Sequence, residues 1–380
     1  MNMKHTDVSA MGNKWGKRFI VAGGGTGGHI FPAIAIANAL KKMSPQSTFL
    51  FVGAKGKMEM EKVPQAGFEI KGLTIAGFNR SSLIKNIGLP FKLLSSFYQV
   101  AHIMKQFKPD AVIGVGGYSS FPVLRYAQSR SIPTFIHEAN SFAGKSNIML
   151  GKKAVKVFTA TDGMEKFFPA EKIIVSGNPV RHSIASNQIN REEALRYFGL
   201  SPAKKTVLCV GGSLGAKNIN EAIEKDIALF EKKNLQLIWQ TGKPYLEKAK
   251  EKCKGMGNVY VNDFITQMEY GYAAADIVIS RSGAMAISEL CIVAKPVIFV
   301  PYPFAAEDHQ TVNAQNLVNK NAAMLIEDKE ALLKLVPAII ALSQNVALQE
   351  KMVYNISRLG VYDADNKVAE EILKYLNHES

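Results

Sequence analysis

The sequence has few cysteines and no long apolar run. Its three cysteines, Cys209, Cys253 and Cys291, have no CxxC spacing among 380 residues, which argues against a disulfide framework and a zinc site. No 18 consecutive residues are apolar, and residues 1–17 lack the apolar stretch of a secretory signal. We therefore expect a protein of the reducing cytoplasm without a transmembrane helix, so that any membrane contact is peripheral.

Acidic residues are scarce in the first half of the chain alone. Residues 1–180 carry 23 Lys and Arg against 9 Asp and Glu, whereas residues 181–380 carry 23 of each, so the first half holds the whole formal charge of +14. A positive field confined to one half suggests an anionic partner, either a membrane surface or nucleic acid. A solvated basic surface without function would give the same count.

Short β-branched runs alternate with helical stretches along the chain, which predicts parallel βαβ units. The pattern pauses at a turn cluster at 177–179 and restarts after a helical piece at 191–198. The expected strands are 18–22, 48–52, 111–115, 134–137, 206–210, 235–240, 276–280 and 296–300. We expect an α/β protein with two Rossmann-like domains that face each other across a ligand-binding cleft. The last helix, 366–376, has no sheet partner that the sequence identifies.

A glycine loop, Gly23–Gly28, follows the first expected strand. Glycines allow close backbone approach, and amides at a helix start favour negative oxygens. The loop matches the dinucleotide pattern GxGxxG, but residues 23–58 contain no Asp or Glu to bind an NAD ribose. Lys55 keeps NADP binding as a minor alternative. The other alternative is a tight turn that binds no ligand.

His29 follows the last glycine of this loop at the start of a helix. A histidine there can accept a proton near neutral pH, and the helix dipole lowers its pKa. The alternative is a histidine that only packs or caps the helix.

The second half carries a similar loop, Gly211–Ala216, in which Ser213 adds a hydroxyl donor. Arg281 stands beside helix-start amides and suits a diphosphate, and Glu289 could accept two hydrogen bonds from a ribose. An ordinary solvated glutamate would look the same. The polar residues at 308–316 fit the binding of sugar hydroxyls but also a plain helix start. No acidic pair or His/Cys cluster indicates a bound metal.

Residues 71–108 contain six basic residues and no acidic one. Apolar residues recur there at helical spacing, from Ile87 through Phe91, Leu94 and Tyr98. Basic and exposed apolar side chains together could dock on an anionic bilayer. The stretch 78–89 is the favoured membrane contact, because 91–101 could instead be a crossover helix packed with its apolar side on the sheet.

Seven short motifs occur in order between residues 24 and 314. They are GGTGGH (24–29), GGY (116–118) with Pro122, HE-x-N (137–140), NPVR (178–181), GGS-x-GA (211–216), RSGA (281–284) with Ser288 and Glu289, and HQ-x-x-NA (309–314). Each motif is unspecific alone. The ordered set closely resembles the MurG family, the undecaprenyl-diphosphate-muramoylpentapeptide β-N-acetylglucosaminyltransferases.

The resemblance implies the GT-B glycosyltransferase fold. An N-terminal acceptor- and membrane-binding domain would span 17–179 and a C-terminal UDP-GlcNAc-binding domain 180–363, while a final helix, 364–380, would return to the first domain. The implied reaction is inverting transfer of N-acetylglucosamine from UDP-GlcNAc to the 4-hydroxyl of the muramoyl sugar of lipid I, giving lipid II for peptidoglycan, without a cofactor or an essential metal. The enzyme would lie peripherally on the cytoplasmic face of the bacterial inner membrane. Its partners would be UDP-GlcNAc, lipid I, the anionic membrane surface and cell-wall synthesis proteins, and not nucleic acid.

Motif positions also assign residues to roles. Catalysis would rest on His29 as the base and on Arg281. The UDP-GlcNAc contacts would be Thr26, Gly27, Gly28, Asn140, Arg181, Ser213, Ile265, Ala284, Met285, Ala286, Ile287, Ser288, Glu289, His309 and Gln310. The acceptor diphosphate would lie on Gly25, Gly116, Gly117 and Tyr118. The membrane contact, inferred from the basic apolar stretch, would be Phe78, Arg80, Leu83, Lys85, Ile87 and Lys92.

One position departs from the family pattern, because this chain has Ala139 where the family often has glutamine. A contact made by that amide near either sugar is therefore missing here.

Alternative functions that the sequence leaves open are a soluble UDP-GlcNAc 2-epimerase or a GT-B glycosyltransferase with a different acceptor. An NAD(P) oxidoreductase is disfavoured by the missing ribose carboxylate, and a non-catalytic membrane or nucleic-acid binding module would leave the second-half motifs unexplained.

Overall fold

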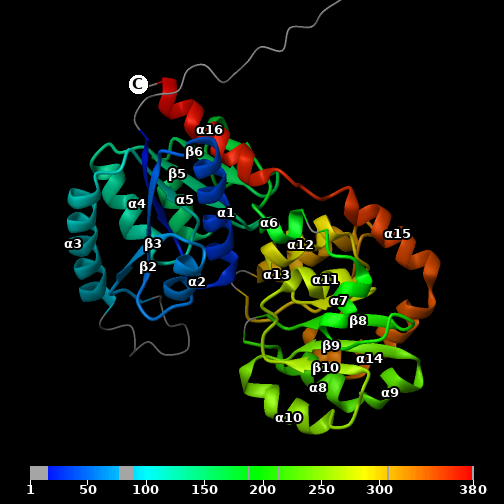
Figure 1. The fold of residues 1–380 in the computed structure, drawn as a ribbon. Helices are drawn as coiled ribbons and strands as arrows, with labels where there is room; N and C mark the ends of the chain where they lie inside the picture. Colours follow the sequence, from blue (N-terminus) through cyan, green and yellow to red (C-terminus); the bar gives the residue numbers. More distant parts are fainter. Residues whose placement is uncertain (1–15, 77–88, 187, 213, 306–307, 379–380) are drawn as a thin grey trace, which may run out of the picture.

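The structure is a computed structural model that describes residues 16–76, 89–186, 188–212, 214–305 and 308–378. Two sheets, each flanked by helices, form the cores of two domains (Figure 1). Every described strand pair is parallel. The predicted α/β fold of two Rossmann-like domains is confirmed.

The first sheet has seven strands in the order β3-β2-β1-β4-β5-β6-β7. The strands are β1 (Arg18–Ala22), β2 (Thr48–Ala54), β3 (Glu69–Leu73), β4 (Ala111–Gly114), β5 (Thr134–Glu138), β6 (Lys156–Thr159) and β7 (Ile173–Val175). The helices of this domain are α1 (Gly27–Met43), α2 (Glu59–Gln65), α3 (Leu89–Phe107), α4 (Ser120–Ser129) and α5 (Lys145–Gly151).

The second sheet has six strands in the order β10-β9-β8-β11-β12-β13. The strands are β8 (Lys205–Val210), β9 (Leu235–Gln240), β10 (Val259–Asn262), β11 (Ile277–Ser280), β12 (Val297–Phe299) and β13 (Met324–Leu325). The helices from the linker onward are α6 (His182–Ala185), α7 (Arg191–Tyr197), α8 (Lys217–Lys225), α9 (Ala228–Lys232), α10 (Leu246–Lys252), α11 (Met268–Ala274), α12 (Ala284–Val293), α13 (His309–Val318), α14 (Ala331–Gln344), α15 (Val346–Ser357) and α16 (Ala364–His378).

Strand β1 lies inside the first sheet between β2 and β4, and its residues Phe19–Ala22 are apolar and fully buried. A strand covered on both faces needs such a continuous apolar run. Ala22 pairs with Val52 of β2 and Gly114 of β4, so the loops after β1 and β4 leave the sheet at the same edge. The register continues through β5, β6 and β7, which brings their loops to this edge as well.

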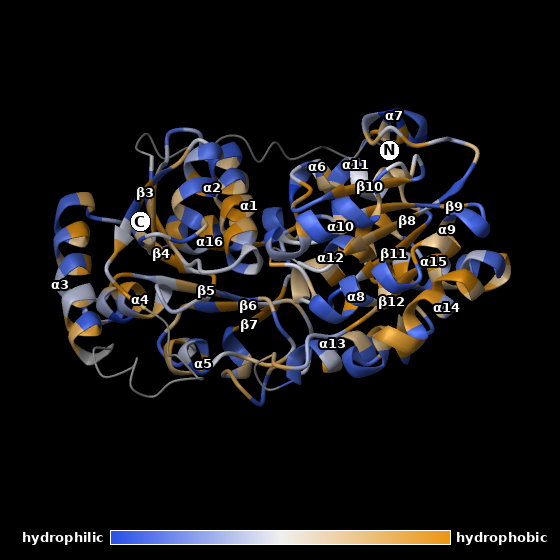
Figure 2. Ribbon diagram, turned by 90° about the horizontal axis from the view of Figure 1, so that it is seen from below, coloured by the Kyte–Doolittle hydropathy of each residue, from blue (hydrophilic) through white to orange (hydrophobic). Residues whose placement is uncertain are grey.

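Strand β8 has the same place in the second sheet. Figure 2 shows hydrophobic colouring concentrated on β8, β11 and β12 in the middle of this domain. Val210 pairs with Gln240 of β9 and Ser280 of β11. The loops after β8, β9 and β11 therefore also share one edge.

Helix α16 lies against α1 of the first domain, far from its neighbours in sequence (Figure 1). Its residues Val368 and Ile372 are fully buried and share an apolar cluster with Phe19, Ile36 and Leu40. Burial of an aliphatic side chain of this size contributes about 1.5–3 kcal/mol. The contact supplies the packing partner that the sequence alone did not identify for this helix.

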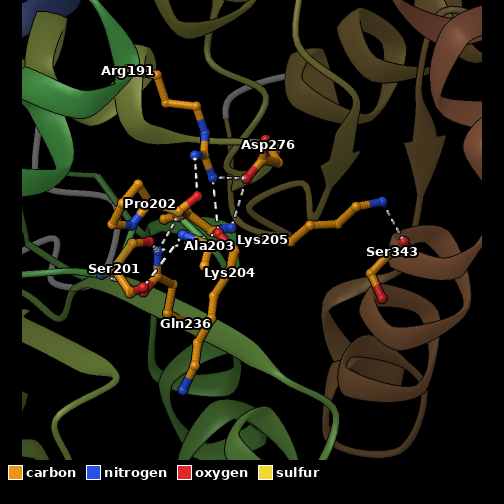
Figure 3. Close-up of polar contacts among 10 residues, drawn as sticks. Arg191, Ser201, Pro202, Ala203, Lys204, Lys205, Gln236, Asp276 and Ser343 are labelled. Carbon is orange, nitrogen blue, oxygen red and sulfur yellow. Dashed lines mark hydrogen bonds and ion pairs between the residues drawn. The ribbon is translucent and has the colours of Figure 1, made fainter.

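A polar network joins α7 to the starts of β8 and β11 (Figure 3). The Arg191 guanidinium donates to the carbonyls of Pro202 (2.9 Å) and Lys204 (2.8 Å) and to Asp276 Oδ2 (2.9 Å). The same Asp276 oxygen accepts a hydrogen bond from the Thr206 amide at 2.7 Å. These groups lie at the amino ends of the strands, at the edge opposite the loops described above, and so have a structural role.

We expect Asp276→Ala to lower the free energy of unfolding by about 2 kcal/mol, because the Arg191 cation and the Thr206 amide lose their shared acceptor. Denaturant unfolding measures this change. Glu247→Ala is the matched control, since its pair with Lys250 is long at 3.8 Å and exposed, and such pairs contribute little. An equal loss of stability in both variants would contradict this assignment.

Candidate active site

The two domains touch through the loop edges of their sheets. The Asn178 amide donates from Nδ2 to the Ala139 carbonyl of the first domain (3.1 Å) and to Ser288 Oγ of the second (3.0 Å). A Cβ atom on Gly28 would lie 4.0 Å from Met285 Cγ, so the starts of α1 and α12 approach each other closely. The facing arrangement of the two loop edges is thus present in the structure.

Two cavities open on either side of this contact. One, of about 680 Å³, lies between α1 and the linker, and its lining includes Phe31, Arg181 and Phe264. The other, of about 610 Å³, lies between the ends of β5–β7 and helices α12 and α13. The region between the domains therefore has room for ligands of nucleotide size.

The two glycine loops of the first domain form one surface. Gly116 and Gly117 have φ values of +93° and +85°, and a Cβ atom on Gly117 would lie 2.4 Å from the Gly24 carbonyl oxygen. The Gly25 amide donates to Glu59 Oε2 at 2.9 Å. The hydroxyl of Tyr118 is buried without a hydrogen-bond partner among the described residues. Burial and the nearby carboxylate of Glu59 raise the pKa of Tyr118.

His29 lies in the first turn of α1, beneath the second of these loops. Its Nδ1 is 3.2 Å from the hydroxyl of Thr26, the N-cap residue, and a Cβ atom on Gly116 would lie 2.8 Å from its Cδ2. Burial lowers the pKa of His29, and Glu138, the Gly24 backbone and Glu59 oppose this effect. The ring is therefore neutral at pH 7 and has a lone pair with which to accept a proton.

Glu138 organises the loop that follows β5. It accepts hydrogen bonds from the Asn140 amide (3.1 Å), the Asn140 side chain (3.2 Å), the Gly144 amide (3.1 Å) and the Asn147 side chain (2.9 Å). Asn140, a predicted donor contact, is thus oriented by Glu138. Neither Glu138 nor Glu59 was among the predicted site residues. Glu138 belongs to the HE-x-N motif, which was the signal available, whereas no motif contains Glu59.

On the second domain, Gln240 joins the glycine loop to the segment after β10. Its Nε2 donates to the Gly212 carbonyl (3.0 Å), and its Oε1 accepts from the Ile265 amide (3.0 Å). The Ile265 amide is thus occupied, which leaves its carbonyl for the predicted contact with the uracil edge. Ser213 lies outside the described residues.

Helix α12 carries the predicted nucleotide residues Ala284–Glu289. Glu289 is 6% exposed; its Oε1 accepts from Arg181 Nε (3.1 Å) and Nη2 (2.9 Å), and its Oε2 accepts from the Tyr272 hydroxyl (3.0 Å). The Arg181 guanidinium also stacks on the Phe31 ring, 4.6 Å from its centroid. The predicted ribose carboxylate and the predicted diphosphate cation therefore bind each other in this structure.

The remaining helix residues have simple environments. Ser288 donates to the Ala284 carbonyl (3.0 Å), Met285 is buried, and Ile287 lines the 610 Å³ cavity. Ala286 is half-buried in the same turn. The predicted contacts of this group stay predictions.

Arg281 and Gln310 tie the ends of β11 and β12 to the start of α13. Arg281 Nη1 donates to the carbonyls of Val300 and Pro301, both at 2.9 Å, and to Asp328 Oδ1 at 2.6 Å. Gln310 Oε1 accepts from the Tyr302 amide at 3.0 Å. His309 is the first residue of α13, beside Gln310. Arg281 thus holds the strand ends together through Nη1. Its Nη2 makes none of these three hydrogen bonds.

Four of the helices that start at these edges have no acidic residue in their first turn. The first turns of α1, α8, α12 and α13 all lack Asp and Glu. Unpaired amides and the positive end of the helix dipole attract anionic groups at such positions. The first turns of these four helices are therefore suited to phosphate.

Of the predicted membrane residues, only Lys92 lies within the described part of the chain, and it is exposed on α3. Phe78, Arg80, Leu83, Lys85 and Ile87 lie outside it. Helix α3 occupies the outer end of the first domain (Figure 2) and exposes Phe91, Leu94 and Tyr98 by 75%, 68% and 80%. This row points away from the sheet, whereas Val100 and Met104 are buried, so α3 covers the sheet with only one of its apolar faces.

The described residues hold neither a candidate metal cluster nor a single membrane-spanning helix. No group of three His, Cys, Asp or Glu side chains could hold a metal ion there. No single described helix has both the length and the apolar composition to cross a membrane. Residues Asp328–Gln344 and Val346–Ser357 meet these criteria only when taken together, and the pair is bent by 95° at the break between them.

Comparison with known proteins places the chain in a family. Residues 19–159 match the N-terminal domain of glycosyltransferase family 28, and residues 206–368 match its C-terminal domain. A Phocaeicola vulgatus protein named UDP-N-acetylglucosamine--N-acetylmuramyl-(pentapeptide) pyrophosphoryl-undecaprenol N-acetylglucosamine transferase is 50% identical over 363 residues, which is 94% of this chain and 96% of that protein. A protein of the same name from Flavobacterium psychrophilum is 50% identical over 95% of this chain and 98% of its own length.

A solved structure points to the same family. The crystal structure of Acinetobacter baumannii MurG matches with a TM-score of 0.73 and 28% identity, covering 94% of this chain and 99% of that one. The chain belongs to the MurG family of glycosyltransferases. A Neisseria meningitidis UDP-GlcNAc 2-epimerase matches with a TM-score of 0.65 at 17% identity, covering 94% and 100% of the two chains, and this likeness to the MurG-family chain is one of fold alone.

Proposed function

We propose that this chain transfers N-acetylglucosamine from UDP-GlcNAc to the 4-hydroxyl of the muramoyl sugar of lipid I, giving lipid II for peptidoglycan synthesis. The observation that carries the proposal is the 50% identity, over nearly the whole chain, to proteins named for this transfer. The geometry supports it, because a neutral histidine and several acid-free helix starts meet between two domains. The chemistry needs both a base and sites for anionic groups.

His29 is the proposed base. The 4-hydroxyl oxygen of the acceptor forms a bond to the anomeric carbon of the donor sugar while its proton moves to the imidazole. The bond from that carbon to the UDP oxygen breaks, and UDP leaves with the electron pair from the opposite face, so the configuration inverts. A histidine with a lowered pKa suits this step because it is unprotonated at pH 7.

Donor binding is proposed to exchange the partners of Glu289. Ribose hydroxyls would take the place of Arg181 at Glu289 Oε1, which now accepts both guanidinium hydrogen bonds. The released guanidinium would then face the diphosphate, together with the amides that begin α8 and α12. These groups offset the charge that develops on the leaving UDP.

The acceptor diphosphate is proposed to lie on the surface formed by the two first-domain glycine loops. The Gly25 amide is engaged by Glu59, so the anion would be bound by the amides of Gly27 and Gly28 in the first turn of α1 and those of Gly117 and Tyr118. The lipid tail would then pass toward the membrane-facing side of this domain.

The membrane contact is proposed to include α3. Its exposed apolar row, with Lys92 beside it, lies on the half of the chain that carries the whole net charge. Such a surface docks peripherally on anionic lipid, here at the cytoplasmic face of the inner membrane. Cell-wall synthesis proteins would meet the enzyme there.

A test of the reaction compares UDP release with and without a lipid-diphosphate muramoyl acceptor. Transfer requires both substrates, so UDP should appear only when the acceptor is present. Epimerisation of UDP-GlcNAc without an acceptor would support the 2-epimerase alternative instead. No observation in the structure favours that alternative.

His29→Ala should lower kcat by about 10²- to 10⁴-fold, because the proton acceptor is lost, while the Kd for UDP-GlcNAc changes less than about twofold. Steady-state kinetics and calorimetry measure the two effects. His102→Ala, at an exposed position on α3, is the control and should have normal kcat. A fully active His29→Ala enzyme would end the proposed role of the base.

Glu289→Gln should weaken UDP-GlcNAc binding about tenfold, because an amide oxygen accepts less strongly than a carboxylate and the amide nitrogen cannot accept at all. Calorimetric titration of the donor measures the change. Glu350→Gln removes the same charge from an exposed position on α15 and should leave affinity unchanged. Equal affinity in the Glu289 variant would remove this residue from the ribose site.

Replacement of Phe91, Leu94 and Tyr98 by serine should weaken binding to vesicles containing anionic lipid by about tenfold or more, since exposed apolar area is lost. Turnover of a short-chain soluble acceptor should not change. Serine at Leu333 and Tyr354, exposed on the second domain, provides the control. Unaltered vesicle binding by the α3 variant would show that this row does not contact lipid.

A further inference from the structure

Tyr272 is a buried tyrosine next to the carboxylate of Glu289. It lies on α11, is 4% exposed and belongs to the apolar cluster of the second domain, together with Leu208 and Leu290. A phenylalanine would fill the same space, and a buried hydroxyl group costs free energy unless it makes a hydrogen bond. The partner of the Tyr272 hydroxyl therefore indicates what this residue does.

That partner is Oε2 of Glu289, 3.0 Å away. Burial and the negative charge of Glu289 raise the pKa of Tyr272 well above its usual value, so the phenol keeps its proton at neutral pH and donates it to the carboxylate. Hydrogen bonds to an ionised acceptor are about twice as strong as neutral ones. The bond therefore restrains the terminal torsion of Glu289, which is otherwise broad in glutamate side chains.

The two oxygens of Glu289 bind different partners. Oε1 accepts both hydrogen bonds from Arg181, at 3.1 and 2.9 Å, and the Arg181 guanidinium also stacks on Phe31 of the first domain. Oε2 accepts from Tyr272, which belongs to the same domain as Glu289. The bond from Tyr272 can therefore persist when Arg181 leaves, whichever way the two domains move relative to each other.

Departure of Arg181 would leave the carboxylate of Glu289, which is 6% exposed, without its cation. A buried carboxylate in that state needs other donors. Two ribose hydroxyls can replace the two guanidinium hydrogens at Oε1 only if the carboxylate keeps its orientation, since each oxygen accepts along its lone-pair directions. The hydrogen bond from Tyr272 to Oε2 supplies that orientation and offsets part of the charge.

We propose that Tyr272 is a positioning residue for the donor ribose: its hydroxyl holds Glu289 Oε2 so that Oε1 accepts from the 2′- and 3′-hydroxyls, which favours ribonucleotides over nucleotides that lack them. The inference rests on the proposed binding of ribose by Glu289. Tyr272 acts through Glu289 and contacts no part of the donor.

The first experiment measures by calorimetry the binding of UDP and of 2′,3′-dideoxy-UDP, which lacks both ribose hydroxyls. The wild type should bind UDP about 100-fold more tightly, because the analogue loses two hydrogen bonds to a carboxylate. Tyr272→Phe should bind UDP about tenfold more weakly than the wild type, with the affinity for the analogue changed less than about twofold. The ratio of the two dissociation constants is measured on one preparation, so a lower stability of the variant cannot imitate this result.

Tyr270→Phe is the matched control. It removes the same hydroxyl from the same helix, but Tyr270 is half-buried and donates to Glu193 at 3.2 Å, away from Glu289. This variant should keep the wild-type ratio. A full wild-type ratio in Tyr272→Phe, or an equal fall of the ratio in Tyr270→Phe, would overturn the proposal.

The second experiment combines Tyr272→Phe with Glu289→Gln. If Tyr272 acts through Glu289, the double variant should bind UDP within about twofold of Glu289→Gln alone, because effects on one hydrogen-bond network are not additive. Additive losses of affinity would mean that Tyr272 influences the donor by another route, and the proposal would fail.

Steady-state kinetics give a third measurement. Tyr272→Phe should raise the KM for UDP-GlcNAc about tenfold and leave kcat within about twofold, because a binding contact is weakened and the proposed base is untouched. A loss of kcat with an unchanged KM would contradict a role in donor binding.

The outcomes separate this inference from the proposed function. Equal affinity of the wild type for UDP and its dideoxy analogue would remove Glu289 from the ribose site, and the role of Tyr272 would fall with it. A wild type that discriminates, together with a Tyr272→Phe variant that discriminates equally, would overturn the role of Tyr272 alone. The binding measurements need no acceptor, so they test Tyr272 even if transfer to lipid I is not observed.

Discussion

Backbone hydrogen bonds between parallel strands determine where chemistry can occur in this protein, because they bring the carboxyl ends of a sheet to one edge. In each domain one central strand, β1 or β8, pairs on both sides and sets the register of the others. The strand ends alone therefore place the functional loops next to one another. They follow the strand ends, and the facing of two such edges creates the space between the domains.

Three buried carboxylates shape this space, and each has different partners. Glu59 binds two backbone amides, Glu138 binds amides and asparagine side chains, and Glu289 binds a guanidinium and a phenol. The first two hold loops in place and have no reason to exchange partners. Glu289 pairs with a cation that is itself suited to phosphate, so its partners can change when a nucleotide arrives.

The sequence predicted the central strands well because burial on both faces demands uninterrupted apolar runs, as in β1 and β4. It missed the four edge strands, β3, β7, β10 and β13, which are largely half-exposed, and it also missed β6, the neighbour of β7. The glycine loops and His29 were recognised from their motif. Glu59 was not, because a carboxylate whose partners are main-chain amides leaves no pattern in the side chains around it. The pairing of Arg181 with Glu289 likewise depends on distance in space, since 108 positions separate them.

The return of α16 to α1 has a consequence for synthesis of the chain. The ribosome makes the strands of the first sheet early, yet the helix that buries the outer side of α1 is among the last residues to emerge. Every strand of the second sheet is made before that helix is available. The domain that begins first must therefore wait, with an apolar face uncovered, until the other has had time to fold.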